Sequence, residues 1–262
     1  MKKTGVTVGD VNAAYDGAIG QVWEILMGEF IHVGGLEESK VLAEKAGVRK
    51  DSYVLDICSA LGGPARFLAK TYGCRVAGLD ATLTMHQESK QRTKAAGLDG
   101  LVSFHLGNAL DIPFADGTFD VVWGEDAWCY ITDKDRLIAE VVRVLKPGGQ
   151  LAFTDWLQAE KAPEEVITRI NKFMIFPYVE SLAGYARLCK KHGLKVLGQE
   201  DLFADFAAKC AGYIGQAGGP LKDRIVTIVG PEVFGGMAAE MVFMGEAAKR
   251  GEFGRGRIIA RR

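Results

Sequence analysis

Two carboxylates occupy positions from which neighbouring strands of a sheet could present them to a ligand. Asp56 lies in a short apolar run, residues 54–57, and Asp80 directly follows a second run, residues 75–79. Small residues fill the turn at 58–63 before a helical pattern begins. A strand, a tight turn and a helix N-terminus bring backbone N–H groups close to a ligand. A carboxylate at the next strand end can accept both hydroxyls of a ribose, so these residues predict a nucleoside-cofactor site.

The turn lacks the glycine pattern of a dinucleotide-binding fold. That fingerprint needs G-x-G-x-x-G, and the corresponding small residues here are Cys58, Ala60, Gly62 and Gly63. The turn also has no Lys or Ser/Thr arrangement typical of a phosphate-gripping loop. The segment that begins at Asp56 instead resembles motif I of the class I S-adenosylmethionine (SAM)-dependent methyltransferases, D-x-G-x-G-x-G, from which Cys58 and Ala60 depart.

Three later segments resemble further blocks of the same family, in the same order and at the usual spacing. They are residues 107–114, 116–123 and 145–149. The resemblance implies an α/β, Rossmann-like sheet that is mostly parallel, has an antiparallel last strand, carries helices on both faces and is covered by a helical lid. It also implies SAM as cofactor and S-adenosylhomocysteine (SAH) as product.

The resemblance places the SAM contacts at four strand ends. Asp56 and the turn would face the methionyl part, Asp80 the ribose, and Asn108 the adenine amino group, with Glu125 near the methionyl end. The residues expected to bind the cofactor are Asp56, Ser59, Gly62, Gly63, Asp80, Ala81, Asn108, Ala109 and Glu125. The same polar side chains can also cap a turn or a helix without touching a ligand, and that alternative stays open.

Residues 15–40 add a narrower resemblance, to the small-amine N-methyltransferases that act on phosphoethanolamine or on sarcosine and dimethylglycine. The likeness implies that Tyr15 closes over the site and that Asp126 holds the amine. The histidine that partners this tyrosine in the phosphoethanolamine enzymes falls at Tyr130. Asp126, Tyr15 and Tyr130 are therefore the expected catalytic residues. The phosphate-gripping residues of those enzymes fall on Met174 and Phe176, so a phosphorylated amine is not expected.

Aromatic side chains near the strand ends give the acceptor site its predicted character. The expected substrate-binding residues are Trp23, Trp128, Trp156, Phe176 and Tyr178. Aromatic faces attract methylated ammonium groups by about 0.5–2 kcal/mol for each contact, which favours a small amine such as sarcosine or dimethylglycine. The same rings could line a site for a flat aromatic or polyketide acceptor methylated on oxygen or carbon, or pack the lid. A non-catalytic SAM-binding protein is the remaining alternative.

Apolar runs alternate with helical patterns along the chain, which is typical of βαβ units and a parallel sheet. The expected strands are residues 54–57, 75–79, 101–106, 119–124, 150–155, 194–199 and 256–260. We expect one methyltransferase domain, residues 1–262, with three additions. These are a cap of two helices at 1–46 and lid segments at 157–190 and 203–252, the last as two helices around a loop at 215–219.

The composition excludes several other classes of protein. The 262 residues are 48% hydrophobic and 25% charged, with a formal net charge of −1, so no basic surface for nucleic acid is expected. No signal peptide or membrane-spanning run is evident. The five cysteines are scattered, which favours neither a disulfide framework nor a metal site. We expect a cytoplasmic monomer or homodimer whose partner is a small-molecule methyl acceptor.

Overall fold

A seven-stranded sheet forms the centre of the molecule, with the strand order β3-β2-β1-β4-β5-β7-β6. The computed structural model describes residues 3–262, so the first two residues of the predicted cap lie outside it. The strands are β1 (Tyr53–Ile57), β2 (Arg75–Asp80), β3 (Val102–Leu106), β4 (Phe119–Glu125), β5 (Leu145–Gln158), β6 (Lys195–Asp201) and β7 (Phe253–Arg261). The last strand runs antiparallel to both of its neighbours, β5 and β6, and the predicted mixed sheet is confirmed.

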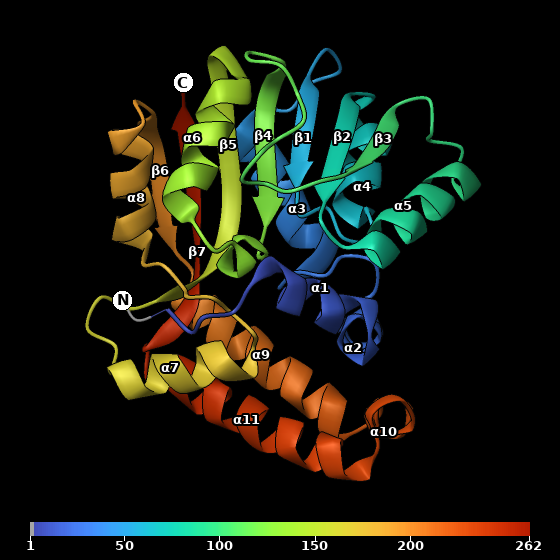
Figure 1. Cartoon of the computed structure of the whole chain (residues 1–262), viewed down its shortest axis with the longest axis vertical. Helices are drawn as coiled ribbons and strands as arrows, with labels where there is room; N and C mark the ends of the chain where they lie inside the picture. Colours follow the sequence, from blue (N-terminus) through green and yellow to red (C-terminus); the bar gives the residue numbers. More distant parts are fainter. Residues whose placement is uncertain (1–2) are drawn as a thin grey trace.

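The helices are arranged around this sheet as Figure 1 shows. They are α1 (Val8–Asp16), α2 (Ala18–Met27), α3 (Gly35–Ala46), α4 (Gly63–Tyr72), α5 (Leu83–Ala95), α6 (Lys134–Val144), α7 (Glu164–Phe173), α8 (Leu182–Lys191), α9 (Phe203–Gly218), α10 (Lys222–Val229) and α11 (Pro231–Lys249), with a short 3₁₀ turn at Trp128–Tyr130. No helix within residues 3–262 combines the length and the apolar character needed to cross a bilayer.

Both faces of the central strands are buried because side chains alternate between them. Val54 of β1 packs with Leu42 of α3 and Leu68 of α4 on one face. Its neighbour Leu55 packs on the opposite face, in the cluster that includes α6 and α8. These near-continuous apolar runs are typical of a parallel sheet covered by helices on both sides.

The sheet order reverses beside β1, and this places the predicted carboxylates along one edge. In the strand register Asp56 lies between Gly78 of β2 and Trp123 of β4. Chain connections leave β1 in one direction and β4 in the other, which opens a crevice at the carboxyl ends of these strands. The crevice is where a ligand is expected to bind.

A layer of helices lies below these carboxyl ends in Figure 1. It consists of α1, α2, α7, α9, α10 and α11, and it has two apolar clusters of its own. Both helices predicted within residues 1–46 are present as α2 and α3, but a further helix that was not predicted, α1, precedes them. Thr7 caps α1, accepting a hydrogen bond from the Asp10 N–H, while the Asp10 carboxylate accepts one from Thr7. Such a capping box starts a helix that hydrophobic periodicity alone does not reveal.

The last addition also differs from its prediction. Residues 203–252 contain three helices, α9, α10 and α11, and α9 continues through Gly215 to Gly218. The glycines at 215 and 218 have open space where a Cβ would stand, so they interrupt neither the helix nor its packing. The break comes instead at Gly219.

Candidate functional site

The turn after β1 holds a backbone conformation that L-residues rarely adopt. Cys58 has φ +62° and Ala60 has φ +44°, while Gly62 has φ +75°. Left-handed backbone costs a residue with a Cβ roughly 1–2 kcal/mol. At the next position, a Cβ on Gly63 would lie 2.4 Å from the Glu29 carbonyl oxygen. The turn therefore keeps a glycine-type shape even at the two positions where the sequence departs from the motif.

Asp80 is fixed by the same turn. Its Oδ2 atom accepts a hydrogen bond from the Ala60 N–H at 2.8 Å, and its Oδ1 atom accepts one from the Thr82 N–H at 2.9 Å. Burial nevertheless raises the pKa of Asp80. An ionised carboxylate has about four acceptor positions, so Asp80 can still accept the two hydroxyls of a ribose.

Asp56 and Ser59 are buried with polar atoms that lack partners. The Oδ2 atom of Asp56 and the Oγ atom of Ser59 have no hydrogen-bond partner among residues 3–262. Burial, and then the negative charge of Asp80, raises the pKa of Asp56 well above its usual range. A buried carboxylate in this state is costly unless a cation or donor reaches it. The α-ammonium of SAM is a group that would fit here.

A pocket of about 80 Å³ lies against Asp80 and the turn. We call it the cofactor pocket. Its walls are Val8, Val11, Asn12, Tyr15, Ile31, Cys58, Ala60, Asp80, Ala81, Thr82, Met85, Asp126, Ala127, Tyr130 and Ile131. It thus joins the carboxyl ends of β1, β2 and β4 to helix α1, which covers them. Of the predicted site residues, Asp80, Ala81, Asp126, Tyr15 and Tyr130 meet here.

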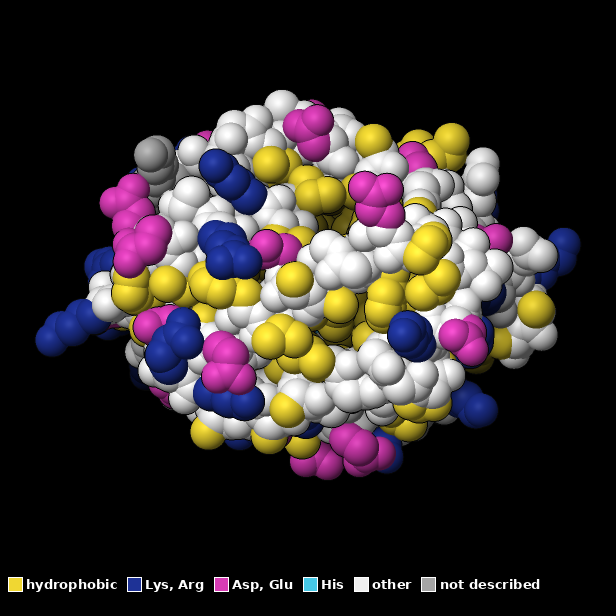
Figure 2. Space-filling view, turned by 90° about the horizontal axis from the view of Figure 1, so that it is seen from below, with side chains coloured by type: hydrophobic (Ala, Val, Ile, Leu, Met, Phe, Trp, Pro, Cys, Tyr) yellow, Lys and Arg dark blue, Asp and Glu magenta, His cyan; other side chains and the backbone are white. Residues whose placement is uncertain are grey.

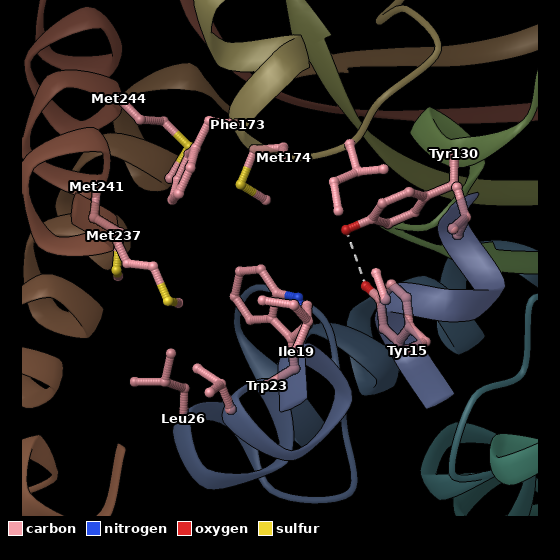
Figure 3. A pocket seen from close by; sticks show the side chains of 14 residues that line it. Tyr15, Ile19, Trp23, Leu26, Tyr130, Phe173, Met174, Met237, Met241 and Met244 are labelled. Atoms are coloured by element: carbon pink, nitrogen blue, oxygen red, sulfur yellow. Dashed lines mark hydrogen bonds between the residues drawn. The ribbon is translucent and has the colours of Figure 1, made fainter. Parts of the chain in front are cut away.

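A second pocket, of about 70 Å³, lies deeper in the helical layer. We call it the apolar pocket. Its walls are Val11, Ala14, Tyr15, Ile19, Val22, Trp23, Leu26, Tyr130, Phe173, Met174, Ile175, Met237, Met241 and Met244. Figure 3 shows Met237, Met241 and Met244 of α11 across the space from Tyr15 and Tyr130. The three methionines recur at spacings of four and three residues, the helical repeat, a signal that the sequence analysis missed.

Tyr15 and Tyr130 separate the two pockets, because both residues line each of them. The Tyr15 hydroxyl donates a hydrogen bond to the Tyr130 hydroxyl at 2.9 Å, and the rings meet edge to face. Figure 3 draws this bond. Burial raises the pKa of both phenols well above the usual value. At neutral pH both phenols therefore keep their protons and can serve as hydrogen-bond donors.

Backbone strain gathers at these two pockets. Within residues 3–262 the non-glycine residues with positive φ are Cys58, Ala60, Asp126 and Ile175. The first three line the cofactor pocket and Ile175 lines the apolar pocket. Strained residues persist where the surrounding structure holds them, and they cluster at functional sites. Their location supports the assignment of both pockets to one site.

Asp126 faces the cofactor pocket, but both of its oxygens are already engaged. Oδ1 accepts a hydrogen bond from the Arg255 Nε at 3.1 Å, and Oδ2 accepts one from the Val33 N–H at 2.9 Å. The Arg255 side chain is fully buried. The carboxylate thus ties the segment between α2 and α3 to the end of β4. This arrangement suits a residue that positions the wall of the pocket.

Glu125 lies behind Asp126 and does not line either pocket. It accepts hydrogen bonds from the Ser39 hydroxyl at 2.9 Å and from the Trp123 indole N–H at 3.1 Å. His32 lies 3.5 Å away. Burial raises the pKa of Glu125 well above its usual range and lowers that of His32 to about 4. The structure thus places Glu125 in a buried polar cluster, and its predicted contact with SAM stays a prediction.

The predicted adenine contacts, Asn108 and Ala109, do not line the cofactor pocket. Asn108 is exposed, and its side-chain carbonyl accepts a hydrogen bond from the Leu110 N–H at 2.9 Å. Ala109 is buried in the core cluster on the α6 face of the sheet. The local turn therefore accounts for Asn108 without a ligand. Its contact with adenine stays a prediction.

The five predicted substrate-binding aromatics divide into three groups. Trp23 lines the apolar pocket. Trp156 and Phe176 form a second layer behind the wall, Trp156 edge to face with Trp23 at 6.3 Å and Phe176 against Tyr130 at 4.8 Å. Trp128 and Tyr178 lie outside both pockets.

Trp128 belongs to the core, contrary to the expectation that it faces an acceptor. Its side chain is fully buried and stacks on Phe153 with ring centroids 4.3 Å apart. Gly124 makes room for it, since a Cβ there would lie 2.3 Å from the indole nitrogen. Tyr178 is engaged elsewhere, because the Lys134 ammonium lies 3.7 Å from its ring centroid. Neither ring is positioned to contact a molecule in the apolar pocket.

Comparisons with known proteins agree with this geometry. Residues 55–153 match the family model described as a methyltransferase domain. The sarcosine/dimethylglycine N-methyltransferase of Halorhodospira halochloris is 42% identical over 120 residues, which are 46% of this chain and 43% of that protein. Methyltransferase GfsG of Streptomyces halstedii is 30% identical over 171 residues, 64% of this chain and 62% of that one. The chain thus spans less than two thirds of either relative.

A solved structure shares the fold along almost the whole chain. Phosphoethanolamine N-methyltransferase 2 of Haemonchus contortus, in complex with SAM, matches 98% of this chain and 60% of its own, with a TM-score of 0.87 at 20% identity. The matched domain, the sheet order and the unpartnered polar atoms at the turn point to the same cofactor. Residues 55–153 are therefore a SAM-dependent methyltransferase domain with the class I fold, and SAM is its cofactor.

Proposed function

We propose that the chain transfers a methyl group from SAM to a small apolar acceptor through an oxygen or carbon nucleophile. The lining of the apolar pocket carries this proposal. Apart from the phenols of Tyr15 and Tyr130 and the indole N–H of Trp23, each lining side chain is a hydrocarbon or a thioether. Walls of this kind bind by removing apolar surface from water, which favours an uncharged acceptor.

The proposed division of labour follows from the two tyrosines. Bound SAM supplies a methyl group that its sulfonium already activates, so the protein must mainly align the acceptor and exclude water. Tyr15 donates to Tyr130, which leaves the Tyr130 proton available for an acceptor oxygen. Because burial raises the pKa of both phenols, we assign them to orientation and not to proton abstraction. As the acceptor atom bonds to the methyl carbon, the S–CH₃ bond breaks, SAH leaves, and the proton that the acceptor loses would pass to water. Asp126, tied to Arg255, would position the wall beside them.

A small amine is the second candidate, and the 42% identity to a sarcosine/dimethylglycine N-methyltransferase favours it. The faces of Tyr15, Trp23 and Tyr130 could also attract an ammonium product. Sarcosine and dimethylglycine, however, carry a carboxylate. Among residues 3–262, no Lys, Arg or His lines the apolar pocket, so a buried carboxylate would lack a cationic partner there. The apolar acceptor therefore ranks first.

An acceptor panel with labelled SAM tests the proposal. The panel contains alkylcatechols and phenols, 1,3-dicarbonyl compounds as carbon acceptors, and sarcosine with dimethylglycine. We expect transfer to the apolar compounds and none to the amino-acid amines. Transfer to sarcosine or dimethylglycine alone would reverse the ranking of the two candidates. SAH binding measured by calorimetry verifies in each case that the cofactor half is intact.

Two matched variants on α11 assign the acceptor to the pocket. Met237→Glu introduces a carboxylate into the apolar wall, while Val233→Glu introduces it at an exposed position of the same helix. We expect Met237→Glu to lose transfer to apolar acceptors and to keep SAH affinity. Val233→Glu should behave as the wild type. Equal activity of both variants would place the acceptor elsewhere.

We further propose that the three additions, residues 1–46, 157–190 and 203–252, act together as the lid over this acceptor. A single domain, a cytoplasmic location, the absence of a nucleic-acid partner and the choice between monomer and homodimer stay predictions. Size-exclusion chromatography with light scattering measures the last of these directly.

A further inference from the structure

A further cavity, of about 150 Å³, lies next to the apolar pocket within the helical layer. We call it the distal cavity. Helix α2, the end of α9, Ile225 of α10 and residues 234–242 of α11 line it, and the exposed Gly218 and Val242 place one side of it at the surface. Figure 2 views the molecule from the side of this layer and shows hydrophobic side chains gathered there, several of them within hollows. Every residue that lines the distal cavity is apolar, so it offers no hydrogen-bonding side chain to a ligand.

The distal cavity and the apolar pocket share part of their walls. Val22 and Leu26 of α2, with Met237 and Met241 of α11, line both. Two of these four shared residues are methionines. Their unbranched thioether side chains change rotamer easily and adapt to irregular shapes. A small movement of the Met237 and Met241 side chains would join the two spaces. The path would then run from Tyr15 and Tyr130 toward α10.

The size and the apolar lining of the distal cavity suit a hydrocarbon. An apolar cavity of roughly 150 Å³ can take up a molecule the size of benzene. We infer that this cavity is a subsite for the apolar tail of the methyl acceptor. The acceptor is then an elongated amphiphile whose nucleophilic head lies at the two tyrosines and whose alkyl, isoprenoid or ring-system tail extends between α2 and α11. This inference rests on the proposed function, because it extends the same acceptor site.

A series of 4-alkylcatechols, from methyl to octyl, tests the inference on the full chain. Two quantities are measured for each compound: equilibrium binding in the presence of SAH, and kcat/KM for methyl transfer from SAM. We expect affinity to rise by about fourfold per added methylene until the cavity is filled. A flat response from methyl to octyl would overturn the subsite.

Two alanines on α11 provide matched variants. Ala238 lines the distal cavity, whereas its neighbour Ala239 is exposed. Ala238→Phe should abolish the gain from the longer tails and leave the methyl compound unchanged, and Ala239→Phe should match the wild type. Gly218→Leu is a second variant that should fill the distal cavity, and we call it and Ala238→Phe the two plugs. At Gly218 an added Cβ meets no atom within 4 Å. Retained SAH binding identifies the variants that fold.

The outcomes separate this inference from the proposed function. Tight binding of long catechols, lost in Ala238→Phe, supports the subsite even if no catechol is methylated. Methylation of short and long catechols alike, unaffected by either plug, supports the proposed function and overturns the subsite. In that case the cavity is a packing defect, and Ala238→Phe should raise stability. If no catechol binds while sarcosine is methylated, both ideas fail.

Discussion

The cofactor half and the proposed acceptor half of the site are built from different kinds of residues and structural elements. The cofactor half uses charged and hydrogen-bonding groups on strand ends, such as Asp56 and Asp80, and a turn held in left-handed backbone. The half that we propose for the acceptor uses helices with apolar side chains, including the methionines of α11. SAM carries an ammonium, a carboxylate and a ribose, which require particular groups at fixed positions. An apolar acceptor requires volume and shape, because burial of apolar surface has no direction.

This difference predicts that the largest single effect lies in the cofactor half. Asp80→Ala removes the carboxylate that we place against both ribose hydroxyls, and each hydrogen bond to a charged group contributes about 1.5–3 kcal/mol. We expect the Kd for SAM and SAH to rise by at least tenfold, measured by calorimetry. Asp99→Ala, at an exposed loop position, is the control. Unchanged affinity in a folded Asp80→Ala protein would remove Asp80 from the site.

The pH dependence of folding stability should also distinguish the two halves of the site. His32, behind the cofactor half, has its pKa lowered to about 4 by burial, against about 6.5 in an unfolded chain. Between these pH values His32 is protonated in the unfolded state but not in the folded state. The free energy of unfolding therefore falls as the pH falls from about 6.5 to about 4. The loss amounts to roughly 3 kcal/mol at 1.36 kcal/mol per pKa unit.

Urea unfolding of the wild type and His32→Gln across this pH window measures the effect. The glutamine can still bond to Ser39 and Glu125 but does not titrate. The stability difference between the two proteins should therefore shift by about 3 kcal/mol toward the variant at low pH. Parallel pH profiles would show that His32 does not carry the penalty. Met237→Gln, in the apolar half, should leave the profile of the wild type unchanged.

The same contrast determines how much could be predicted from the sequence. The strand ends at Asp56 and Asp80 were predictable because a carboxylate in or directly after a buried apolar run is costly unless a donor or cation meets it. The sheet order then brings the two strand ends together. The fold, the cofactor and the Tyr15–Tyr130 pairing of residues 115 apart came from the resemblance of motifs. These features depend on directional contacts, which require specific residue types.

The acceptor half could not be predicted in this way. Helix α1 has a single buried residue, Val11, so its hydrophobic pattern hardly indicates a helix. Trp128 follows β4 like a ligand-facing residue, yet the 3₁₀ turn and the space above Gly124 direct its ring into the core. Side-chain direction after a strand end depends on local backbone angles that composition does not encode. The sequence therefore predicted the cofactor of one pocket and overestimated the aromatic lining of the other.

Substitutions at Trp23 sharpen the comparison between an apolar and a cationic acceptor. Trp23→Leu and Trp23→Phe both keep an apolar side chain in the wall, but the phenylalanine alone keeps an aromatic face. An ammonium acceptor should distinguish the two variants by several-fold in kcat/KM, since a cation–π contact contributes about 0.5–2 kcal/mol. For the apolar acceptor that we propose, the two variants should agree within about twofold. A larger gap would favour the amine.

The smallest effect is expected at Cys58. Here the turn of the cofactor half has a left-handed backbone although the residue is not a glycine. Burial, and then the charge of Asp80, raises the pKa of the thiol well above its usual value, so it is not a nucleophile at neutral pH. Cys58→Ala should therefore keep most of the methyl-transfer activity. Loss of all turnover with SAH binding intact would contradict this.

Cys58→Gly, compared with Cys58→Ala, then measures the strain in the turn. Both variants remove the sulfur, but only the glycine accepts φ +62° without cost. Relief of left-handed strain is worth roughly 1–2 kcal/mol, and the greater backbone entropy of glycine in the unfolded chain offsets about 0.5–1 kcal/mol of it. We expect Cys58→Gly to be about 0.5–1 kcal/mol more stable than Cys58→Ala in urea unfolding. If the alanine variant is the more stable one, the turn relaxes around its side chain, and the contrast between a strained cofactor half and an adaptable acceptor half no longer holds.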